Sequence, residues 1–203
     1  MRPSWLLICA LLLWALSWLT ASAAVAPPKG CFVADRVGAL HPDTLRALDD
    51  SLRTYHSATG NRIVVAIMDS SMVCGGVEES ARQLVKQWGL SRDRAALLLV
   101  LKPRTTGRPR AYVAPSEVLK PRFARMFCRH LGSDKVAGPI YDGHTYYHGI
   151  TNGLPYIKCV MEGRFTAEDY RVERAGRWWP WYIAAGVALL LVAAFFPRRR
   201  NTP

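Results

Sequence analysis

The sequence predicts an α/β fold: a three-layer α/β/α sandwich with a small mixed sheet, followed by one C-terminal transmembrane helix. Two continuous apolar runs, 62–68 and 95–101, carry this prediction. Each run is too short for a buried helix, and turn residues border it, so both are expected to be strands covered on both faces. Patterns of helical period lie before, between and after the runs, which indicates a sheet packed between helices.

The first half of the domain follows this alternation. Residues 32–37 are predicted to form a short entry strand. Pro42 opens a helix, since proline is tolerated in a first turn, and Gly60 is expected to end that helix in the left-handed conformation. After the strand 62–68 comes a polar loop, 69–76, at the carboxyl end of a central strand, where open α/β sheets usually bind ligands.

The second half contains a hairpin. A second helix is predicted to end at Gly89 before the strand 95–101. Residues 102–109 form a basic turn, and 110–114 return as a strand. Because so short a connection allows only an antiparallel pair, the sheet is expected to be mixed.

Helices are expected to complete the domain. Ser116 is the predicted N-cap of a third helix. Residues 132–142 read as a linker, and 143–161 read as the last helix.

The two ends of the chain read as targeting segments. Residues 1–23 have a basic start, an apolar run and an Ala-x-Ala site, which are typical of a signal peptide cleaved after Ala23. Residues 178–196 are uncharged and long enough to cross a bilayer. The predicted organisation is therefore an exported domain at 24–163, a juxtamembrane linker at 164–177, the span, and a basic cytoplasmic tail at 197–203. We expect a single-pass protein of the inner membrane with a periplasmic domain.

The charge of the chain limits its partners. The net charge is +12, but all 15 acidic residues and 23 of the 27 basic residues lie in 24–177, so the exported part carries +8. Export argues against a nucleic-acid partner. A basic domain tethered to a membrane would instead experience the negative potential of its anionic lipids, or it would bind acidic partners. The plainer alternative is a basic surface that is only solvated.

Four cysteines remain after the predicted cleavage: Cys31, Cys74, Cys128 and Cys159. An even number in an exported domain predicts two disulfides, with three ways to pair them, and free buried thiols are the alternative. The wide spacing does not match the close cysteine pairs of zinc sites.

Several motifs occur in an order that resembles TPM domains. Residues 32–40 resemble the entry motif of these domains, with an aspartate, a glycine and a leucine before the first helix. Residues 59–65 resemble their second strand, 88–100 their tryptophan–glycine turn and third strand, and 141–153 their closing helix. The resemblance covers about residues 31–161. It implies an α/β/α sandwich in envelope or thylakoid-lumen proteins with one membrane helix.

The resemblance also implies three lines of activity: weak acid phosphatase action, calcium binding, and assistance to membrane-protein complexes. Two departures bear on these. Asp93-Arg94-Ala95 stands where such families usually have Asp-Asn-Gly, and 112–116 lacks their Gly-x-Gly. These changes remove flexibility and carboxylates where a cation or phosphate would bind.

The best catalytic set consists of Asp35, Asp69 and Asp93 near strand ends, with Arg36 or Arg94 beside them. Carboxylates at strand ends could hold a divalent cation such as Ca²⁺, whereas the plainer interpretation makes them caps and turn residues. His144 and His148 share a helix face but lack a third ligand, so no metal or other cofactor is assigned.

Two functions of different classes follow. The first is a membrane-anchored, non-catalytic TPM-like module that binds or stabilises membrane-protein partners. The second is a weak, metal-dependent acid phosphatase. The absence of an independent catalytic motif and the lost acidic cluster favour the first. Its partner contact is expected at the loop 69–76 or at the basic hairpin, through Arg104, Arg108 and Arg110.

Overall fold

The computed structural model describes residues 30–73, 75–166, 169, 183 and 186. Its strands are β1 (Val33–Asp35), β2 (Arg62–Asp69), β3 (Ala95–Lys102) and β4 (Arg110–Pro115). Its α-helices are α2 (Pro42–Thr59), α3 (Val77–Gln87), α4 (Arg125–His130), α5 (Gly138–Tyr141) and α6 (Tyr146–Met161). Short 3₁₀ turns η2 (Ser70–Met72), η3 (Leu90–Arg92) and η4 (Lys120–Arg122), and a π-helical segment η5 (Leu131–Ala137), connect them.

The predicted targeting segments fall almost entirely outside these residues. The signal peptide 1–23 and the tail 197–203 are not described, and the span 178–196 contributes only Ile183 and Gly186. Within the part of the chain that is described, no helix has the length and apolar character needed to cross a membrane.

The sheet is mixed, as the hairpin predicts. Its strands lie in the order β1-β2-β3-β4; the first three are parallel and β4 is antiparallel to β3. One row of partners crosses the whole sheet, from Val33 through Val65 and Leu98 to Val113. The α/β prediction and the four predicted strands are confirmed.

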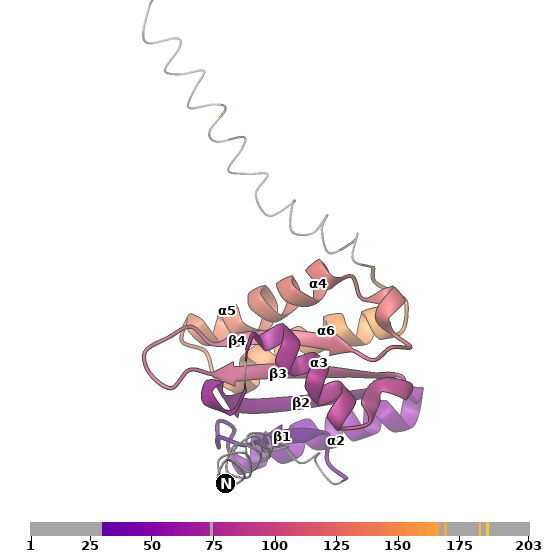
Figure 1. Ribbon diagram of the computed structural model, residues 1–203, viewed down its shortest axis with the longest axis horizontal. Coiled ribbons are helices and arrows are strands. Elements are labelled where there is room, and N and C mark those ends of the chain that lie inside the picture. Colours follow the sequence, from indigo (N-terminus) through magenta and orange to yellow (C-terminus); the bar gives the residue numbers. More distant parts are fainter. Residues whose placement is uncertain (1–29, 74, 167–168, 170–182, 184–185, 187–203) are drawn as a thin grey trace, which may run out of the picture.

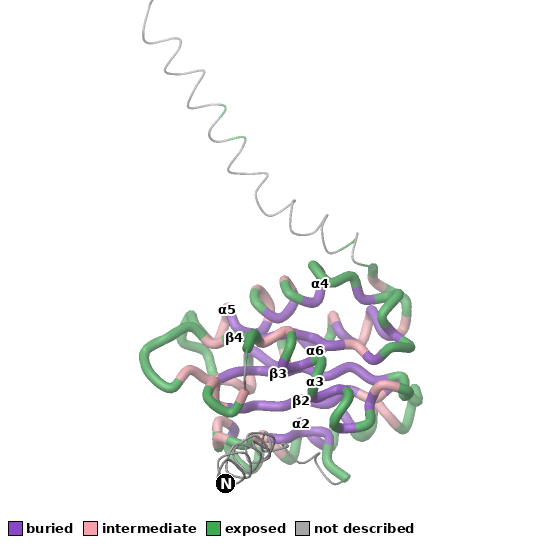
Figure 2. Tube along the Cα trace, in the orientation of Figure 1, coloured by how far each residue is buried: buried purple, intermediate pink, exposed green. Residues whose placement is uncertain are grey.

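Helices cover both faces of the sheet. In Figure 1, α3 lies in front of the strands, whereas α2 and α6 lie behind them. The interiors of β2 and β3 are buried along their length, which explains their continuous apolar sequences (Figure 2). On the rear face, the Lys158 ammonium of α6 lies 5.0 Å from the ring centroid of Tyr55 on α2.

The ends of α2 follow the local sequence. His41 is the N-cap, and its Nδ1 accepts a hydrogen bond from the Asp43 amide at 3.4 Å. Gly60 ends the helix with φ +70°, and its amide donates to the His56 carbonyl at 2.8 Å. Only glycine reaches this left-handed conformation without strain, so the predicted cap is confirmed.

The predicted start of the third helix at Ser116 is wrong. Ser116 lies buried in a turn where its amide donates to the Ala95 carbonyl at 2.8 Å, and α4 begins only at Arg125. Pro121 explains the difference, because it has no amide to continue a helix from Ser116 and disfavours helical geometry at Lys120. The chain forms the short turn η4 there instead.

The predicted linker 132–142 is wrong as well. The segments η5 and α5 make it helical, and α6 begins at Tyr146 with Thr145 as its N-cap. Leu131 and Val136 are fully buried. Gly132 allows close packing against β4, and Pro139 occupies a first helical turn, so neither residue interrupts these helical segments.

The two predicted disulfides are not formed among the described cysteines. Cys31, Cys128 and Cys159 are free thiols, and Cys74 lies outside the described residues. Cys31 precedes the edge strand β1, whereas Cys128 lies on α4 against β4 at the opposite edge. Three strand spacings of about 4.8 Å separate the two edges. A disulfide requires Cα atoms within about 7 Å, so this pair cannot form.

Candidate functional site

Asp35 lies at the end of β1 and closes a turn. Its carboxylate accepts hydrogen bonds from the amides of Val37, at 3.0 Å, and Leu40, at 2.8 Å. These two bonds hold the entry segment against the start of α2. The carboxylate therefore serves the backbone, which is the plainer of the two roles expected for it.

Asp69 lies at the end of β2 and caps η2. Its Oδ1 accepts from the amide of Ser71 at 2.8 Å and from the Ser71 hydroxyl at 2.6 Å. The Arg104 guanidinium lies 3.5 Å from the same oxygen. The hydrogen bonds from Ser71, followed by the charge of Arg104, favour the ionised carboxylate and hold the pKa of Asp69 below its ordinary value.

Replacement of Ser71 by alanine is expected to raise the pKa of Asp69, because the hydrogen bond from the Ser71 hydroxyl, which contributes most to lowering this pKa, is lost. In the wild type, the ionised Asp69 carboxylate stabilises the fold at pH values above the pKa that Asp69 has in the unfolded chain. This contribution is lost as the pH falls through the lower pKa that Asp69 has in the folded protein. Carboxyl-carbon NMR titration measures the shift. Ser70→Ala serves as the control, and equal Asp69 titration in wild type and Ser71→Ala would contradict the assignment.

Asp93 does not join these two carboxylates. It precedes β3, whereas Asp69 pairs in register with Lys102 at the other end of that strand. Eight residues of parallel strand separate the two ends by roughly 26 Å. Accordingly, the described residues contain no group of three or more His, Cys, Asp or Glu side chains that could hold a metal ion.

The structure also describes the surroundings of the candidate arginines Arg36 and Arg94 and of the histidine pair. The Arg94 Nε donates to the Asn61 side-chain oxygen at 2.9 Å, which ties β3 to the start of β2, and Arg36 also has contacts within the described structure. His144 and His148 do come together at the start of α6, with ring centroids 4.6 Å apart. Both are exposed.

The basic hairpin does not present one continuous face. Arg104 pairs with Asp69, and the Arg108 guanidinium lies 4.4 Å from the ring centroid of Tyr141 on α5. Arg110, the first residue of β4, instead lines a cleft. The three arginines of the predicted contact face therefore have three different surroundings.

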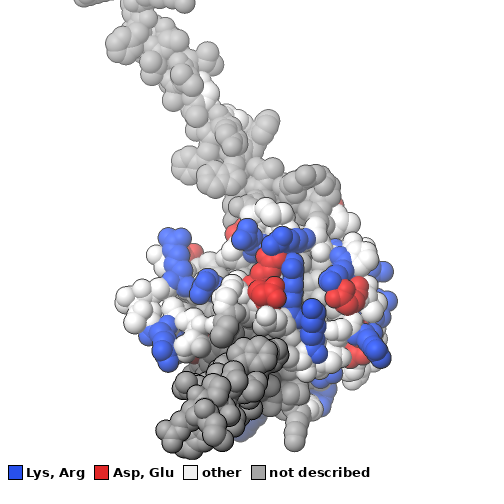
Figure 3. All heavy atoms as spheres, in the orientation of Figure 1, with Lys and Arg blue, Asp and Glu red and all other residues white. Residues whose placement is uncertain are grey.

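This cleft, which we call the arginine cleft, has a volume of about 500 Å³. It lies between the start of α3, the strand β4, the helix α4 and the segment η5. Its charged lining residues are Glu78, Glu79, Arg82, Arg110, Arg125 and Arg129. Figure 3 shows blue basic side chains around a small red acidic group on this face of the molecule.

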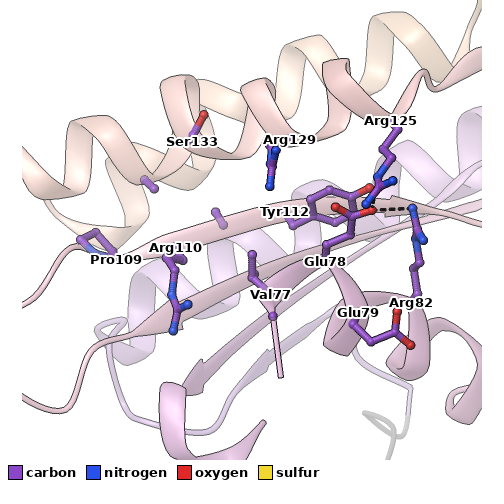
Figure 4. A pocket seen from close by; sticks show the side chains of 13 residues that line it. Val77, Glu78, Glu79, Arg82, Pro109, Arg110, Tyr112, Arg125, Arg129 and Ser133 are labelled. Carbon is purple, nitrogen blue, oxygen red and sulfur yellow. Dashed lines mark hydrogen bonds and ion pairs between the residues drawn. The ribbon is translucent and has the colours of Figure 1, made fainter. Parts of the chain in front are cut away.

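Glu78 is the centre of a charged network in the arginine cleft. Its Oε1 accepts from Arg82 Nη2 and from Arg125 Nε, both at 2.6 Å. The Glu78 side chain is only 16% exposed, whereas Arg125 is 72% exposed. Figure 4 shows Arg125 reaching from α4 toward Glu78 on α3. One carboxylate thus joins two elements that are 47 residues apart in the sequence.

Tyr112 and Cys128 lie beneath this network. Tyr112 is buried on β4, and burial raises the pKa of its phenol. Burial also raises the pKa of the Cys128 thiol to about 12. A thiol that stays protonated is a poor nucleophile and a poor metal ligand, so Cys128 is a packing residue.

Arg110 and Arg129 differ from the other two arginines of the cleft. Both are exposed, and neither side chain forms an ion pair or hydrogen bond with another described residue. Figure 4 shows Arg129 reaching from α4 toward the strand that carries Tyr112. The cleft therefore contains two guanidinium groups without a counter-ion among the described residues.

The sequence pointed to only part of this site. It singled out Arg110 and the loop before α3, whose last residue, Gly76, lines the cleft. It missed Glu78 and Arg82, although their spacing of four on a helix is a recognisable ion-pair signal. Nothing local could have indicated that Arg125 completes the network.

Comparison with known proteins adds the family. Residues 33–158 match the TPM domain family. A solution NMR structure of the N-terminal domain of a protein from P. gingivalis is similar in fold, with a TM-score of 0.54 at 18% identity. The similarity covers 68% of this chain and 93% of that domain. No curated protein matches the chain. Because the family match extends over more than half of the sequence, the chain belongs to the TPM domain family.

Proposed function

We propose that this chain is a membrane-anchored, extracytoplasmic TPM module that binds or stabilises membrane-protein partners without catalysing a reaction. The arginine cleft is its contact site. The sequence features that predict a signal peptide and a membrane span support this location, and the basic composition of the predicted exported part suits acidic partners.

The observation that carries the proposal is the pair Arg110 and Arg129. In a cleft where Glu78 already pairs with Arg82 and Arg125, Arg110 and Arg129 remain available to an incoming group. Charged groups that are exposed before binding mainly provide attraction and specificity toward a partner of opposite charge. A contact role therefore accounts for residues that the fold does not use.

The carboxylates also favour binding over hydrolysis. Hydrolysis of a phosphate ester requires a nucleophile or an activated water next to groups that stabilise developing charge. Asp35 and Asp69 are committed to backbone amides, and Asp93 lies at the far end of the sheet. Of the two acidic residues that line the cleft, Glu78 and Glu79, Glu78 is held by two arginines instead of being directed at open space.

Charge reversal at both positions, Arg110→Glu with Arg129→Glu, is expected to abolish recovery of the partner. The repulsion introduced at the cleft opposes an acidic surface directly. Recovery is measured by cross-linking the full-length chain in native membranes, followed by purification and quantitative mass spectrometry.

Arg46→Glu with Arg92→Glu is the matched control, since it changes the net charge equally at exposed positions outside the cleft. Loss of the same partners in the control would assign recovery to overall charge. Undiminished recovery with the cleft variant would remove the cleft from consideration.

A further inference from the structure

We infer that the arginine cleft binds carboxylate groups of an acidic protein segment, with Arg110 and Arg129 as the groups that receive them. This inference rests on the proposed binding function and specifies the chemistry of its ligand. It assigns the recognition to aspartate or glutamate side chains of the partner.

The cleft already shows how it holds a carboxylate. Glu78 accepts one hydrogen bond from each of two guanidinium groups, Arg82 on its own helix and Arg125 on α4, with both distances at 2.6 Å. Hydrogen bonds between guanidinium and carboxylate groups are short and strong because both partners are charged and planar. The site built around Glu78 is thus a carboxylate site that the fold fills with its own residue.

A second carboxylate meets similar surroundings at Arg110 and Arg129. Both arginines line the same cleft as Glu78, one from β4 and one from α4, and neither has a counter-ion among the described residues. Arginine presents its donors as a rigid fork that suits a carboxylate, whereas lysine acts as a point charge. All four cationic residues that line the cleft are arginines.

The shape of the cleft suits a short peptide segment. Its volume of about 500 Å³ lies within the usual range for binding sites and exceeds what one carboxylate needs. Gly76 and Val77 at the start of the eleven-residue helix α3 form part of the wall, so the positive end of that helix adds to the attraction. The apolar wall residues Val77, Pro109, Ala111 and Ala137 can contact the aliphatic parts of glutamate side chains.

The test uses the full-length chain in a neutral detergent. The probe is an end-capped peptide of four consecutive glutamates that carries a neutral fluorophore, and the matched probe replaces each glutamate by glutamine. Fluorescence anisotropy is expected to show binding of the glutamate peptide only. Raising the ionic strength is expected to weaken that binding, since exposed charges are screened by salt.

Arg110→Gln with Arg129→Gln is expected to weaken peptide binding by about tenfold or more. The pair Arg46→Gln with Arg92→Gln, which removes the same charge elsewhere, is expected to leave binding within about twofold. Neither Arg110 nor Arg129 forms an ion pair or hydrogen bond with another described side chain. The variant Arg110→Gln with Arg129→Gln should therefore keep the thermal transition temperature of the wild type, which is measured in parallel.

Three outcomes would overturn the inference: equal weakening in both double variants, equal binding of the glutamine peptide, or binding of inorganic phosphate without binding of the glutamate peptide. The last result would assign the cleft to phosphate groups. If Arg110→Glu with Arg129→Glu loses the partner but the wild-type chain does not bind the glutamate peptide, the proposed function stands and only the ligand class is refuted. If the same variant recovers the partner normally although the wild-type chain binds the peptide, the proposed function alone is refuted.

Discussion

Replacement of Gly132 by alanine is expected to lower the free energy of unfolding by about 3 kcal/mol, the upper range for overpacking of a tight interior. A Cβ at this position would overlap the Ala111 carbonyl oxygen and approach its carbon to 2.5 Å and the Tyr112 Cα to 2.9 Å. All three atoms belong to the backbone of β4, which is paired to β3 and cannot move aside. Chemical denaturation monitored by circular dichroism measures the loss.

Gly76→Ala is the matched control for this substitution. Gly76 has φ −81°, and a Cβ built there meets no atom within 4 Å. The same chemical change should therefore cost much less than Gly132→Ala, namely the modest loss expected when alanine replaces glycine at the N-cap of α3. If Gly132→Ala unfolds at the midpoint of the control, the direct contact between η5 and β4 is not as close as described.

Replacement of Asp49 by alanine is also expected to cost about 3 kcal/mol of unfolding free energy, the upper range for a buried donor left without its charged acceptor. The Asp49 Oδ1 accepts from the amides of Phe32, at 2.5 Å, and Val33, at 3.1 Å, where β1 begins. Its Oδ2 accepts from Arg53 at 2.8 Å, and the side chain is only 11% exposed. Without the carboxylate, the two amides have no acceptor from α2.

Asp49→Asn separates the hydrogen bonds from the charge. The amide oxygen of asparagine can still accept from the backbone at β1, so a smaller loss than for alanine is expected, as measured by urea denaturation. Hydrogen exchange at Phe32 and Val33 provides a second readout, with faster exchange in the alanine variant. Slow exchange at both amides in Asp49→Ala would show that they have another acceptor and would contradict the prediction.

The arginine cleft could be predicted only in pieces. Arg110 stands in a basic hairpin, and Glu78 and Arg82 are four residues apart on a helix, so each has a local signal. Their convergence with Arg125 depends on η5 and α4 folding over β4. The sequence suggested a helix start at Ser116 and a linker at 132–142 instead. These two errors misplaced the elements that form the wall with Arg125 and Arg129.

The candidate carboxylates were ambiguous for a different reason. An aspartate at a strand end suits a cation site and a turn equally well, since both use the same oxygens as acceptors. Asp35 and Asp69 each accept from backbone amides within five residues, and Asp93 is separated from them by the length of β3.

Local sequence signals predict the buried strands at 62–68 and 95–101, the hairpin that makes the sheet mixed, and the left-handed cap at Gly60. Such signals suffice because apolar runs, short connections and glycine conformations act within a few residues of the chain. Which charged groups meet depends instead on how distant elements pack in the folded domain. Ion pairs such as Glu78 with Arg125 join residues 47 positions apart, and their strength depends on a distance that no local pattern contains.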